Sequence, residues 1–457
     1  MSKKVISYGA KIIDKPVIND KIFDNTVAIS KESVSFIIDV VEKEWQDIKD
    51  LATSKEKVNY VEKLIHETKD NSNPKYSMFD KLFYKFPSYL RRNNVSEAIG
   101  IVSSYHTNLD KYEKERYKAI SSGKKFKKKV PKLSLEHNKF PVLFKGNMFN
   151  KIDDNTVQIK VYKNFDWVWL NVKLRNQDIK YIQKNCYLLK ELSPALEKKG
   201  MNYKLKFSYE YRLNLPKEKP IKDRLVCTVD LGINTSAVCS IATYNGTVLA
   251  EKFINPAKEK DHMYRLINKV SKAQYEGGRY AKIVGLWRKI DNIKSEITNQ
   301  VVNKIIKFAL ENNADVIVLE YLGKMKLRGY GAKRNRRRIQ NWNKRTISSK
   351  LKEIAHRKGM RYAFINPKNT SSLAYDGSGK VERNKKNFSI CKFSSGKVYN
   401  CDLNATKNIA ARYFIREIEK SMDESSWLQF KAKVPELAIR TNCTLNTLIS
   451  LVRVLNC

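Results

Sequence analysis

The sequence predicts an α+β protein of several domains, and three observations support this fold class. The chain has 457 residues, which suggests roughly three domains at about 150 residues each. Hydrophobic residues make up 42% of it, enough to fill real cores, which argues against a disordered basic tail. The spacing of these residues changes along the chain from a helical period to strict alternation, and then to apolar runs separated by helical segments.

The N-terminal half combines a helical region with strands. A short strand is expected at 5–8, and within 31–125 apolar residues recur every three or four positions, as on the buried face of a helix. Apolar and polar residues then alternate at 157–161 and 203–215, which predicts strands with one buried face. Residues 126–218 are therefore expected to form a β-barrel or sandwich.

Short apolar runs in the C-terminal half predict the strands of a second sheet. In chain order we expect three strands of an antiparallel meander, a long helix, a strand, a helix, a strand and a final helix. This is the order of elements in ribonuclease H, so an RNase H-like α/β domain is expected here. The corresponding ranges are 225–231, 237–242, 248–254, 283–308, 316–320, 348–358, 362–365 and 402–414.

Three carboxylates stand where an apolar residue would be expected. Asp230 lies inside an apolar strand, Glu320 ends another strand, and Asp402 begins the last helix. The RNase H order would bring them together, and a buried carboxylate without compensation is costly. Two Mg²⁺ ions about 3.5–4 Å apart, with Mn²⁺ as a substitute, would neutralise the three acids and support in-line phosphodiester hydrolysis. Taken singly, Asp402 could instead be a helix N-cap and Glu320 a surface acid.

The charge of the chain points to a polyanionic partner. Its 89 Lys and Arg residues exceed its 47 Asp and Glu residues, and the difference gives a formal charge of +42. Surplus cations repel one another in a compact state, and nucleic acid is the usual partner that removes this cost. The charge argues against an enzyme that acts only on small molecules. An acidic membrane surface is the weaker alternative.

Other sequence features concern the compartment. No apolar run approaches the ~18 residues of a membrane span, and the first residues lack the apolar core of a signal peptide. The protein is therefore expected to be soluble, without a membrane partner, in the cytoplasm of a prokaryotic cell and associated with the nucleoid. Its seven Cys show no disulfide spacing, and we expect them to be reduced thiols.

Two basic segments are candidates for nucleic-acid contacts. A glycine-containing cationic loop beside a nuclease site is typical of a mobile lid that feeds a strand into it, and the segment after Glu320 has this form. Either segment could instead be a solvated charge run. The first contains Lys124, Lys125, Lys127, Lys128 and Lys129. The second contains Lys333, Arg334, Arg336, Arg337 and Arg338.

The residues around the three carboxylates resemble the RuvC motifs of TnpB-like nucleases and of the compact type V CRISPR effectors. The match covers about 224–415, and the N-terminal half resembles the family in layout alone. Asn366-Pro367 followed by Thr370-Ser371 resembles the segment that leads into the family's zinc ribbon. The three motifs are Asp230-Leu231-Gly232-Ile233-Asn234, Leu319-Glu320-Tyr321-Leu322 and, most specific, Asp402-Leu403-Asn404-Ala405-Thr406-Lys407-Asn408-Ile409-Ala410.

The resemblance implies a domain layout and an activity. The activity is that of an RNA-guided DNA endonuclease, which binds a guide RNA and pairs it with target DNA next to a short adjacent motif. Such an enzyme holds the displaced single strand and cleaves both strands at one RuvC site. The layout is a wedge β-barrel at 1–30 and 126–218, a helical recognition lobe at 31–125, a RuvC domain at 219–366 and 402–420, and a zinc-ribbon-like target-binding insert at 367–401. The tail at 421–457 lies outside the resemblance, and the spacing of its Leu445, Leu448 and Leu451 predicts a short amphipathic helix.

The insert departs from the family, which usually carries two Cys-x-x-Cys pairs there. The positions of the first pair fall near Ala374 and Gly377, and in the second pair Cys391 is followed by Ser394. With Cys401 there are two cysteines, which cannot make a closed four-ligand zinc site. We therefore expect no zinc, and an insert that folds without it or is weakly ordered.

Two other functions stay open from the sequence. One is a cleavage-deficient RNA-guided repressor that occupies DNA, and the other is a guide-independent RNase H-fold resolvase or transposase. The three acids argue against the first, while the third motif and the split N-terminal layout argue against the second. The sequence leaves open whether the guide is a transposon-end RNA or a CRISPR RNA, and whether the protein is a monomer or a homodimer.

Overall fold

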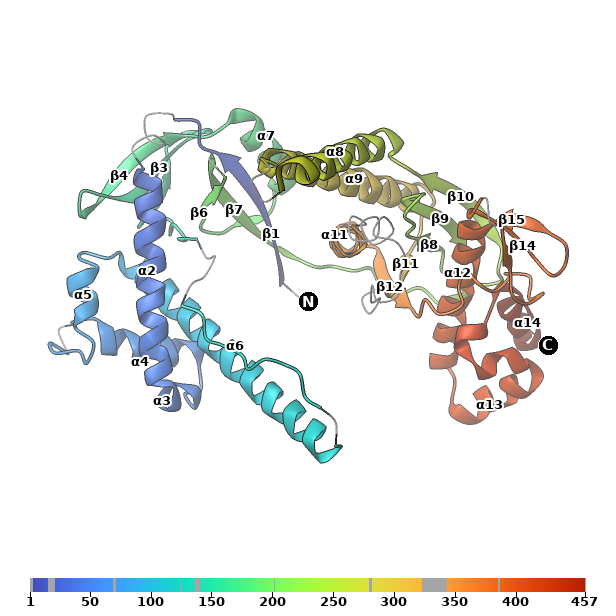
Figure 1. The fold of residues 1–457 in the computed structure, drawn as a ribbon. Helices are drawn as coiled ribbons and strands as arrows, with labels where there is room; N and C mark the ends of the chain where they lie inside the picture. The colour runs from blue at the N-terminus through green and yellow to red at the C-terminus, as the bar shows by residue number, and fades with distance from the viewer. Residues whose placement is uncertain are drawn as a thin grey trace. The chain divides into compact units, whose positions relative to one another are not determined.

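The computed structural model describes residues 3–14, 21–68, 71–123, 125–135, 140–200, 202–278, 282–322, 343–384 and 387–456. The chain folds into two compact units, Met1–Arg212 and Leu213–Cys457, and each contains helices and strands (Figure 1). The predicted mixed α/β fold of several domains is confirmed at this level. The first unit ends close to residue 218, where the sequence places the end of the N-terminal half.

The first helix of the first unit is long. This helix, α2, begins at Ile22, ahead of residue 31, where the helical region is expected to start. Phe23 and Val27 are buried, so the apolar face of the helix extends back beyond the predicted start. It packs along α6, the other long helix of this unit (Figure 1). The helices are α2 (Ile22–Lys43), α3 (Trp45–Lys49), α4 (Ser54–Ile65), α5 (Met78–Leu82), α6 (Ser88–Ser121) and α7 (Asn176–Cys186).

The strands of the first unit form two antiparallel sheets, one of β1, β7, β5 and β6 and one of β2, β3 and β4. Strand β1 pairs with β7 along its whole length, with Ile6 opposite Tyr209, so residues far apart in the sequence share one sheet. A bridge between Ile12 and Leu174 links the two sheets. The strands are β1 (Lys3–Lys11), β2 (Phe149–Lys151), β3 (Thr156–Lys163), β4 (Asp166–Lys173), β5 (Lys190–Glu191), β6 (Ala195–Lys199) and β7 (Asn202–Arg212).

One hydrophobic core runs through the helices and both sheets of this unit. It contains the alternate residues Tyr203, Leu205 and Phe207 of β7, as the alternation in the sequence predicts. The core does not separate a barrel from a helical lobe. The division of the first unit into a wedge barrel and a recognition lobe therefore stays a prediction.

The second unit is built on a five-stranded sheet in the order β10-β9-β8-β11-β12 (Figure 1). Strands β8, β9 and β10 pair antiparallel, whereas β11 pairs parallel with both β8 and β12. This confirms the predicted order of strands. The strands are β8 (Val226–Asp230), β9 (Ala237–Ala242), β10 (Val248–Ile254), β11 (Val316–Glu320) and β12 (Arg361–Ile365).

Helices cover both faces of this sheet. Cys227 and Val229 of β8 share a core with α8, α9 and α11, while Val226 shares a different core with α12 and the tail, because successive side chains of a strand point to opposite faces. Helix α8 was not among the predicted elements, because charged residues surround its short apolar stripe. The helices are α8 (Ala257–Gly277), α9 (Val284–Glu311), α11 (Lys344–Arg357) and α12 (Cys401–Lys420).

The C-terminal tail is part of the second unit. Leu445, Leu448 and Leu451 are buried in a core that they share with residues of α12. This confirms the short amphipathic helix expected there. Among the described residues, no helix combines the length and hydropathy that crossing a bilayer requires. The tail contains α13 (Glu424–Lys433), two short 3-10 turns at Pro435–Ala438 and Arg440–Asn442, and α14 (Leu445–Asn456).

The insert before α12 forms a small antiparallel sheet of β13 (Glu382–Arg383), β14 (Ile390–Lys392) and β15 (Val398–Asn400). Its own core contains the four buried residues Ala374, Cys391, Phe393 and Cys401. Tyr375 and Tyr399 pack against this core, in ring contact with each other and with Phe393. Apolar and aromatic side chains thus fill the centre of a segment that a metal holds in the family it resembles.

Candidate active site

The fold brings the three predicted carboxylates to one edge of the sheet. Asp230 is the last residue of β8 and Glu320 is the last residue of β11. These strands are parallel neighbours with Val229 opposite Leu319, so their carboxyl ends meet at the same edge. Asp402 lies in the first turn of α12, which packs across both strands. The expected meeting of the three acids is therefore present in the fold.

The electrostatics of the three groups agree with this proximity. Burial raises the pKa of Asp230 well above its usual range, and the nearby charges of Glu320 and Asp402 raise it further. Burial also raises the pKa of Glu320 and that of Asp402. Three buried acids, one of which is repelled by the charges of the other two, are typical of a site that binds positive charge.

The donor set suits a hard cation such as Mg²⁺, which prefers oxygen ligands. Within the described residues, no donor hydrogen-bonds to the carboxylate of Asp230 or Asp402, so their oxygens are available. In the same part of the chain, no three His, Cys, Asp or Glu side chains form a group that could hold a metal ion as they stand. Mg²⁺ is commonly held by one or two carboxylates together with substrate phosphates rather than by a protein cage. Asp230, Glu320 and Asp402 fit a Mg²⁺ site of this kind, in which phosphates of the substrate would supply the remaining ligands.

Asp402 is not the N-cap of its helix. The side chain of Asn400 caps α12 instead, with its Oδ1 accepting from the backbone N–H of Asp402 at 2.9 Å and of Leu403 at 3.0 Å. The capping role that the sequence allows for Asp402 is thus filled by its neighbour. The Asp402 carboxylate remains free to face the other two acids.

Glu320 is held in place by the segment that follows β12. The hydroxyl of Thr370 donates to Glu320 Oε1, and this hydrogen bond opposes the rise in the Glu320 pKa that burial causes. Thr370 is itself buried, and its carbonyl accepts a hydrogen bond from Asn408 Nδ2 at 3.0 Å. A buried polar contact of this kind does not fit a strand-end surface acid, which was the alternative for Glu320.

Two uncharged residues of the third motif, Asn404 and Asn408, have a structural role. Asn404 and Asn408 are fully buried and lie on one face of α12, four residues apart. Their amide groups donate to the carbonyl of Leu373 at 2.8 Å each, and Asn404 Oδ1 accepts from the backbone N–H of Tyr375 at 2.8 Å. They fasten the loop that carries Thr370 to the helix that carries Asp402.

Arg412 extends this face of α12 by one further turn. Its guanidinium, which is 2% exposed, donates to the carbonyl oxygens of Asn366, Lys368, Thr441 and Cys443. Burial lowers its pKa to about 10, and the charge of Glu320 acts in the opposite direction. One side chain therefore ties the loop after β12 to the C-terminal tail behind the site.

Replacing Arg412 with Met should lower the free energy of unfolding by roughly 4 kcal/mol, because four carbonyl hydrogen bonds of about 1 kcal/mol each are lost. Urea denaturation would measure this change. Arg412→Lys should recover part of it, since a lysine keeps the charge and some donors. The exposed Arg453 of α14 is the matched control, and an equal loss in Arg453→Met would contradict the assignment.

Arg383 of β13 is a cation of the site that the sequence analysis missed. It lies close enough to Asp230 and Asp402 for its charge to oppose the rise of both pKa values. It is exposed, and its guanidinium donates to Ser371 Oγ at 2.9 Å. A charged residue in a short strand of the insert gives no periodic signal. Only the packing of the insert against the sheet edge reveals its place.

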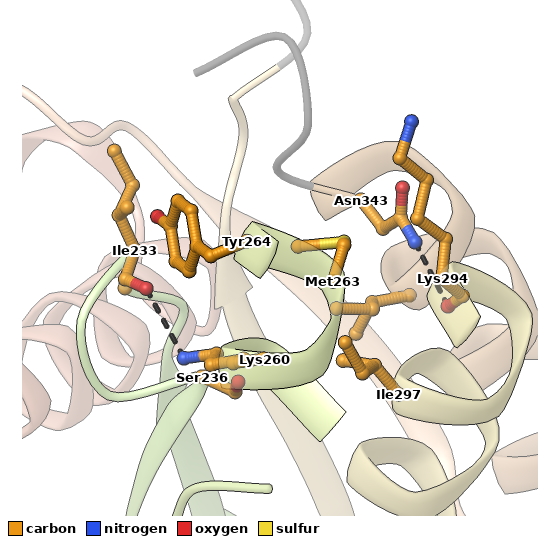
Figure 2. Close-up of a pocket in the computed structure, with 10 residues that line it drawn as sticks. Ile233, Ser236, Lys260, Met263, Tyr264, Lys294, Ile297 and Asn343 are labelled. Carbon is orange, nitrogen blue, oxygen red and sulfur yellow. Dashed lines mark hydrogen bonds between the residues drawn. The ribbon is translucent and has the colours of Figure 1, made fainter. Parts of the chain in front are cut away.

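The loop after Asp230 has little conformational freedom. A Cβ at Gly232 would lie 2.5 Å from the carbonyl oxygen of Thr235, so this turn requires glycine. Lys260 Nζ donates to the carbonyls of Ile233 at 3.1 Å and Asn234 at 2.6 Å. Figure 2 shows Lys260 reaching Ile233 at the wall of a small pocket beside this loop. Lys260 of α8 thus helps to fix the first motif.

The predicted nucleic-acid contacts are described only in part. Lys125, Lys127, Lys128 and Lys129 are exposed after α6, and Lys128 forms an ion pair with Glu115. Lys124, Lys333, Arg334, Arg336, Arg337 and Arg338 lie outside the described residues.

Comparisons of the sequence with known proteins give two matches. A family model described as the Aq_aa04 family matches residues 7–163. A protein of Aquifex aeolicus (strain VF5), named as a TnpB-like protein, is 25% identical over 235 residues, which are 47% of this chain and 76% of the relative.

Several solved structures of Cas12 proteins are similar in part. A Cas12f1–guide RNA–target DNA complex matches with 14% identity and a TM-score of 0.34, over 90% of this chain and 99% of that chain. CasPhi-2 (Cas12j) bound to crRNA and phosphorothioate DNA matches with 9% identity and a TM-score of 0.47, over 90% and 91%. It is the TnpB-like relative, together with the three motifs, that confirms the resemblance of this chain to the TnpB-like family.

Proposed function

We propose that this protein is an RNA-guided DNA endonuclease with a single RuvC-type active site. The observation that carries the proposal is the meeting of Asp230, Glu320 and Asp402 at the carboxyl edge of the five-stranded sheet. Burial and mutual repulsion raise the pKa of Asp230, as expected for metal ligands without their metal. The TnpB-like relative supports the assignment to this class of nuclease.

In the proposed site the three carboxylates would hold two Mg²⁺ ions. Bound there, the ions would activate a water molecule and stabilise the leaving 3′ oxygen. Thr370 would keep Glu320 oriented through its hydroxyl, which leaves the second carboxylate oxygen for a ligand. Arg383, beside Asp230 and Asp402, would neutralise a phosphate of the strand as it enters. Zinc would have no role, since the four-cysteine set is incomplete.

The partners would be a guide RNA, a target DNA duplex and its displaced single strand. The formal charge of +42 supports binding to long polyanions, whose affinity comes from neutralised phosphates and released counterions. The exposed Lys125, Lys127 and Lys129 would belong to this surface. The protein would act in the cytoplasm next to the nucleoid. The first unit would combine the wedge barrel and the recognition lobe of the family.

A repressor without cleavage activity is the second candidate. It is favoured by one observation, which is that the insert lacks the cysteine pairs of the family it resembles, with Ser394 where a partner of Cys391 would stand. A protein of this kind would bind guide RNA and target DNA and leave the DNA intact. The presence of all three acids at one edge favours the nuclease.

The test is to purify the protein, sequence the RNA that comes with it, and supply a plasmid that carries the matching target. We expect linear product in Mg²⁺ and intact plasmid in EDTA. Bound RNA without cleavage in Mg²⁺ or Mn²⁺ would favour the repressor. Cleavage by RNA-free protein would favour a guide-independent nuclease and overturn the proposal.

A further inference from the structure

The hairpin of β3 and β4 (Figure 1) closes in a turn that its sequence does not favour. Lys163 pairs with Asp166, so the loop has only two residues, Asn164 and Phe165. Both have a positive φ, 50° for Asn164 and 63° for Phe165, as in the type I′ turns that close hairpins of this length. Asparagine adopts this conformation readily, whereas the second position usually holds glycine. The backbone of the turn is therefore strained at Phe165.

The ring of Phe165 does not compensate for this strain by packing. It is 83% exposed, so little of its apolar surface is removed from water. In the part of the chain that the structure describes, Phe165 is the one apolar residue other than glycine with a positive φ. Glycine would close the same turn without strain and without an exposed ring. A strained residue that adds little packing points to a role in binding rather than in folding.

A second loop places another exposed ring next to this turn. Tyr84 is 61% exposed, and the Nζ of the following Lys85 lies 5.3 Å from the centre of its ring. The same Nζ lies 3.5 Å from Asp166 Oδ2 at the end of the hairpin turn. The rings of Phe86 and Trp167 meet edge to face at 5.4 Å, which fastens the two loops to each other. Each loop therefore contributes one exposed aromatic ring to the same surface.

We propose that the rings of Phe165 and Tyr84 form a stacking site for an unpaired base of a nucleic-acid strand, with lysines beside the phosphates of that strand. Exposed rings among cations hold single strands in this way, because every base has a π-face. The two loops carry Lys85 and Lys163 and one carboxylate, that of Asp166. The side chains of Lys85 and Asp166 are 57% and 49% exposed, so their ion pair contributes little and a phosphate can replace it.

The chemistry of this surface favours a nucleic acid over a protein partner. The cores of protein interfaces are depleted of Lys and Asp, whereas here charged side chains lie beside both rings. The formal charge of +42 attracts a polyanion to the chain as a whole. The inference rests on the proposed function only in that the ligand is a nucleic acid. It involves none of the three carboxylates, so it can be measured in EDTA on protein that does not cleave.

The first experiment locates the contact. The full chain, freed of RNA, is mixed in EDTA with a short oligothymidylate or oligouridylate in which iodouracil replaces one base. The mixture is irradiated, and mass spectrometry identifies the residue that becomes attached. We expect attachment at Phe165 or Tyr84. Attachment of the RNA strand alone would assign the site to the guide, and attachment of the DNA strand alone would assign it to the target. Attachment only at other residues would overturn the proposal.

The second experiment measures the affinity of the same strands by fluorescence anisotropy over a salt series. Phe165→Gly should weaken binding by about tenfold, which lies within the contribution of one stacked base. The factor should be the same at every salt concentration, because stacking releases no counterions. Lys85→Gln should instead reduce the salt slope by about 0.7, as expected for one phosphate contact of a single strand. Phe165→Tyr keeps the ring and should retain the affinity.

The melting temperature separates this role from packing. Phe165→Gly should melt at or above the temperature of the unmodified protein, since glycine adopts a positive φ without strain. Phe165→Asn is the second variant, because asparagine also tolerates this conformation. The matched control is Tyr187→Gly, which removes a ring of the same unit that is 86% exposed, from a residue with an ordinary φ of −46°. Its strand affinity should stay unchanged.

Three results would overturn the inference. They are an unchanged affinity in Phe165→Gly, an equal weakening in Tyr187→Gly, and a lower melting temperature of Phe165→Gly, which would show that the ring stabilises the fold. An unmodified protein that binds neither strand would overturn the proposed function as well. Binding that is equal in the unmodified protein and in Phe165→Gly would overturn the stacking site alone.

Discussion

Replacing Asp230 with Asn is expected to abolish DNA cleavage by the RNA-bound protein and to leave binding of guide and target unchanged. Asn keeps the shape of the side chain and removes the charge that the proposed site needs to hold two ions. Lewis-acid stabilisation by bound metal supplies several kcal/mol, and a loss of about 4 kcal/mol corresponds to roughly a thousandfold in rate. Single-turnover cleavage of a matched target in Mg²⁺ would measure the effect, with a gel-shift assay for binding.

The matched control is Asp261→Asn, since Asp261 is an exposed carboxylate on α8. It removes the same charge from the same unit, so its cleavage rate should stay near that of the unmodified protein. Glu320→Gln and Asp402→Asn should behave like Asp230→Asn. An Asp230→Asn protein that cuts at an undiminished rate would show that the three acids are not the catalytic ligands.

The sheet and its acids could be predicted because their signals are local. Strands β8, β9 and β11 are short apolar runs, and an acid at the end of such a run is conspicuous. Asp230 and Glu320 lie at the ends of adjacent parallel strands, so the order of elements was enough to bring them together. Asp402 could be placed in the same way, because it begins the helix that must cross these strands.

The surroundings of the acids could not be predicted, because they depend on contacts between distant segments. Thr370 reaches Glu320 from the loop after β12, and Arg383 comes from a two-residue strand of the insert. Neither has a periodic pattern. Asn404, Asn408 and Arg412 did carry a signal, which is three polar residues at four-residue spacing on one face of a buried helix. Such spacing would have identified them as residues that fasten loops to α12.

The starts of two helices also show which features local sequence can predict and which depend on packing. Asp402 has the residue type of an N-cap, and the sequence alone could not decide between Asn400 and Asp402. The structure gives the cap to Asn400, because the helix already begins at Cys401. Helix α2 begins at Ile22 without a side-chain cap. Packing of its apolar face decides that boundary, and boundaries set by packing leave no mark in the local sequence.

Replacing Asp230 with Asn should also stabilise the metal-free protein, because it removes the charge of this buried carboxylate. Burial and the neighbouring acids raise the pKa of Asp230, so the folded chain binds a proton more tightly than the unfolded chain does. Stability is then lost as the pH rises from the unfolded carboxyl pKa of about 3.9 through the raised folded value. The Asp230→Asn variant carries no charge at this position, so it avoids this loss of stability.

In EDTA at neutral pH, the melting temperature of Asp230→Asn should therefore exceed that of the unmodified protein by a few degrees, since each 1 kcal/mol shifts a domain of this size by about 2–4 °C. The difference should vanish near pH 4, where the unfolded carboxyl is half protonated and the penalty is small. Mg²⁺ should raise the melting temperature of the unmodified protein by mass action and leave that of Asp230→Asn nearly unchanged. Thermal unfolding by circular dichroism measures all of these, with Asp261→Asn as the control. A variant that melts lower than the unmodified protein in EDTA would mean that Asp230 is stabilised by a partner other than a metal ion, and the electrostatic basis of the proposed site would have to be abandoned.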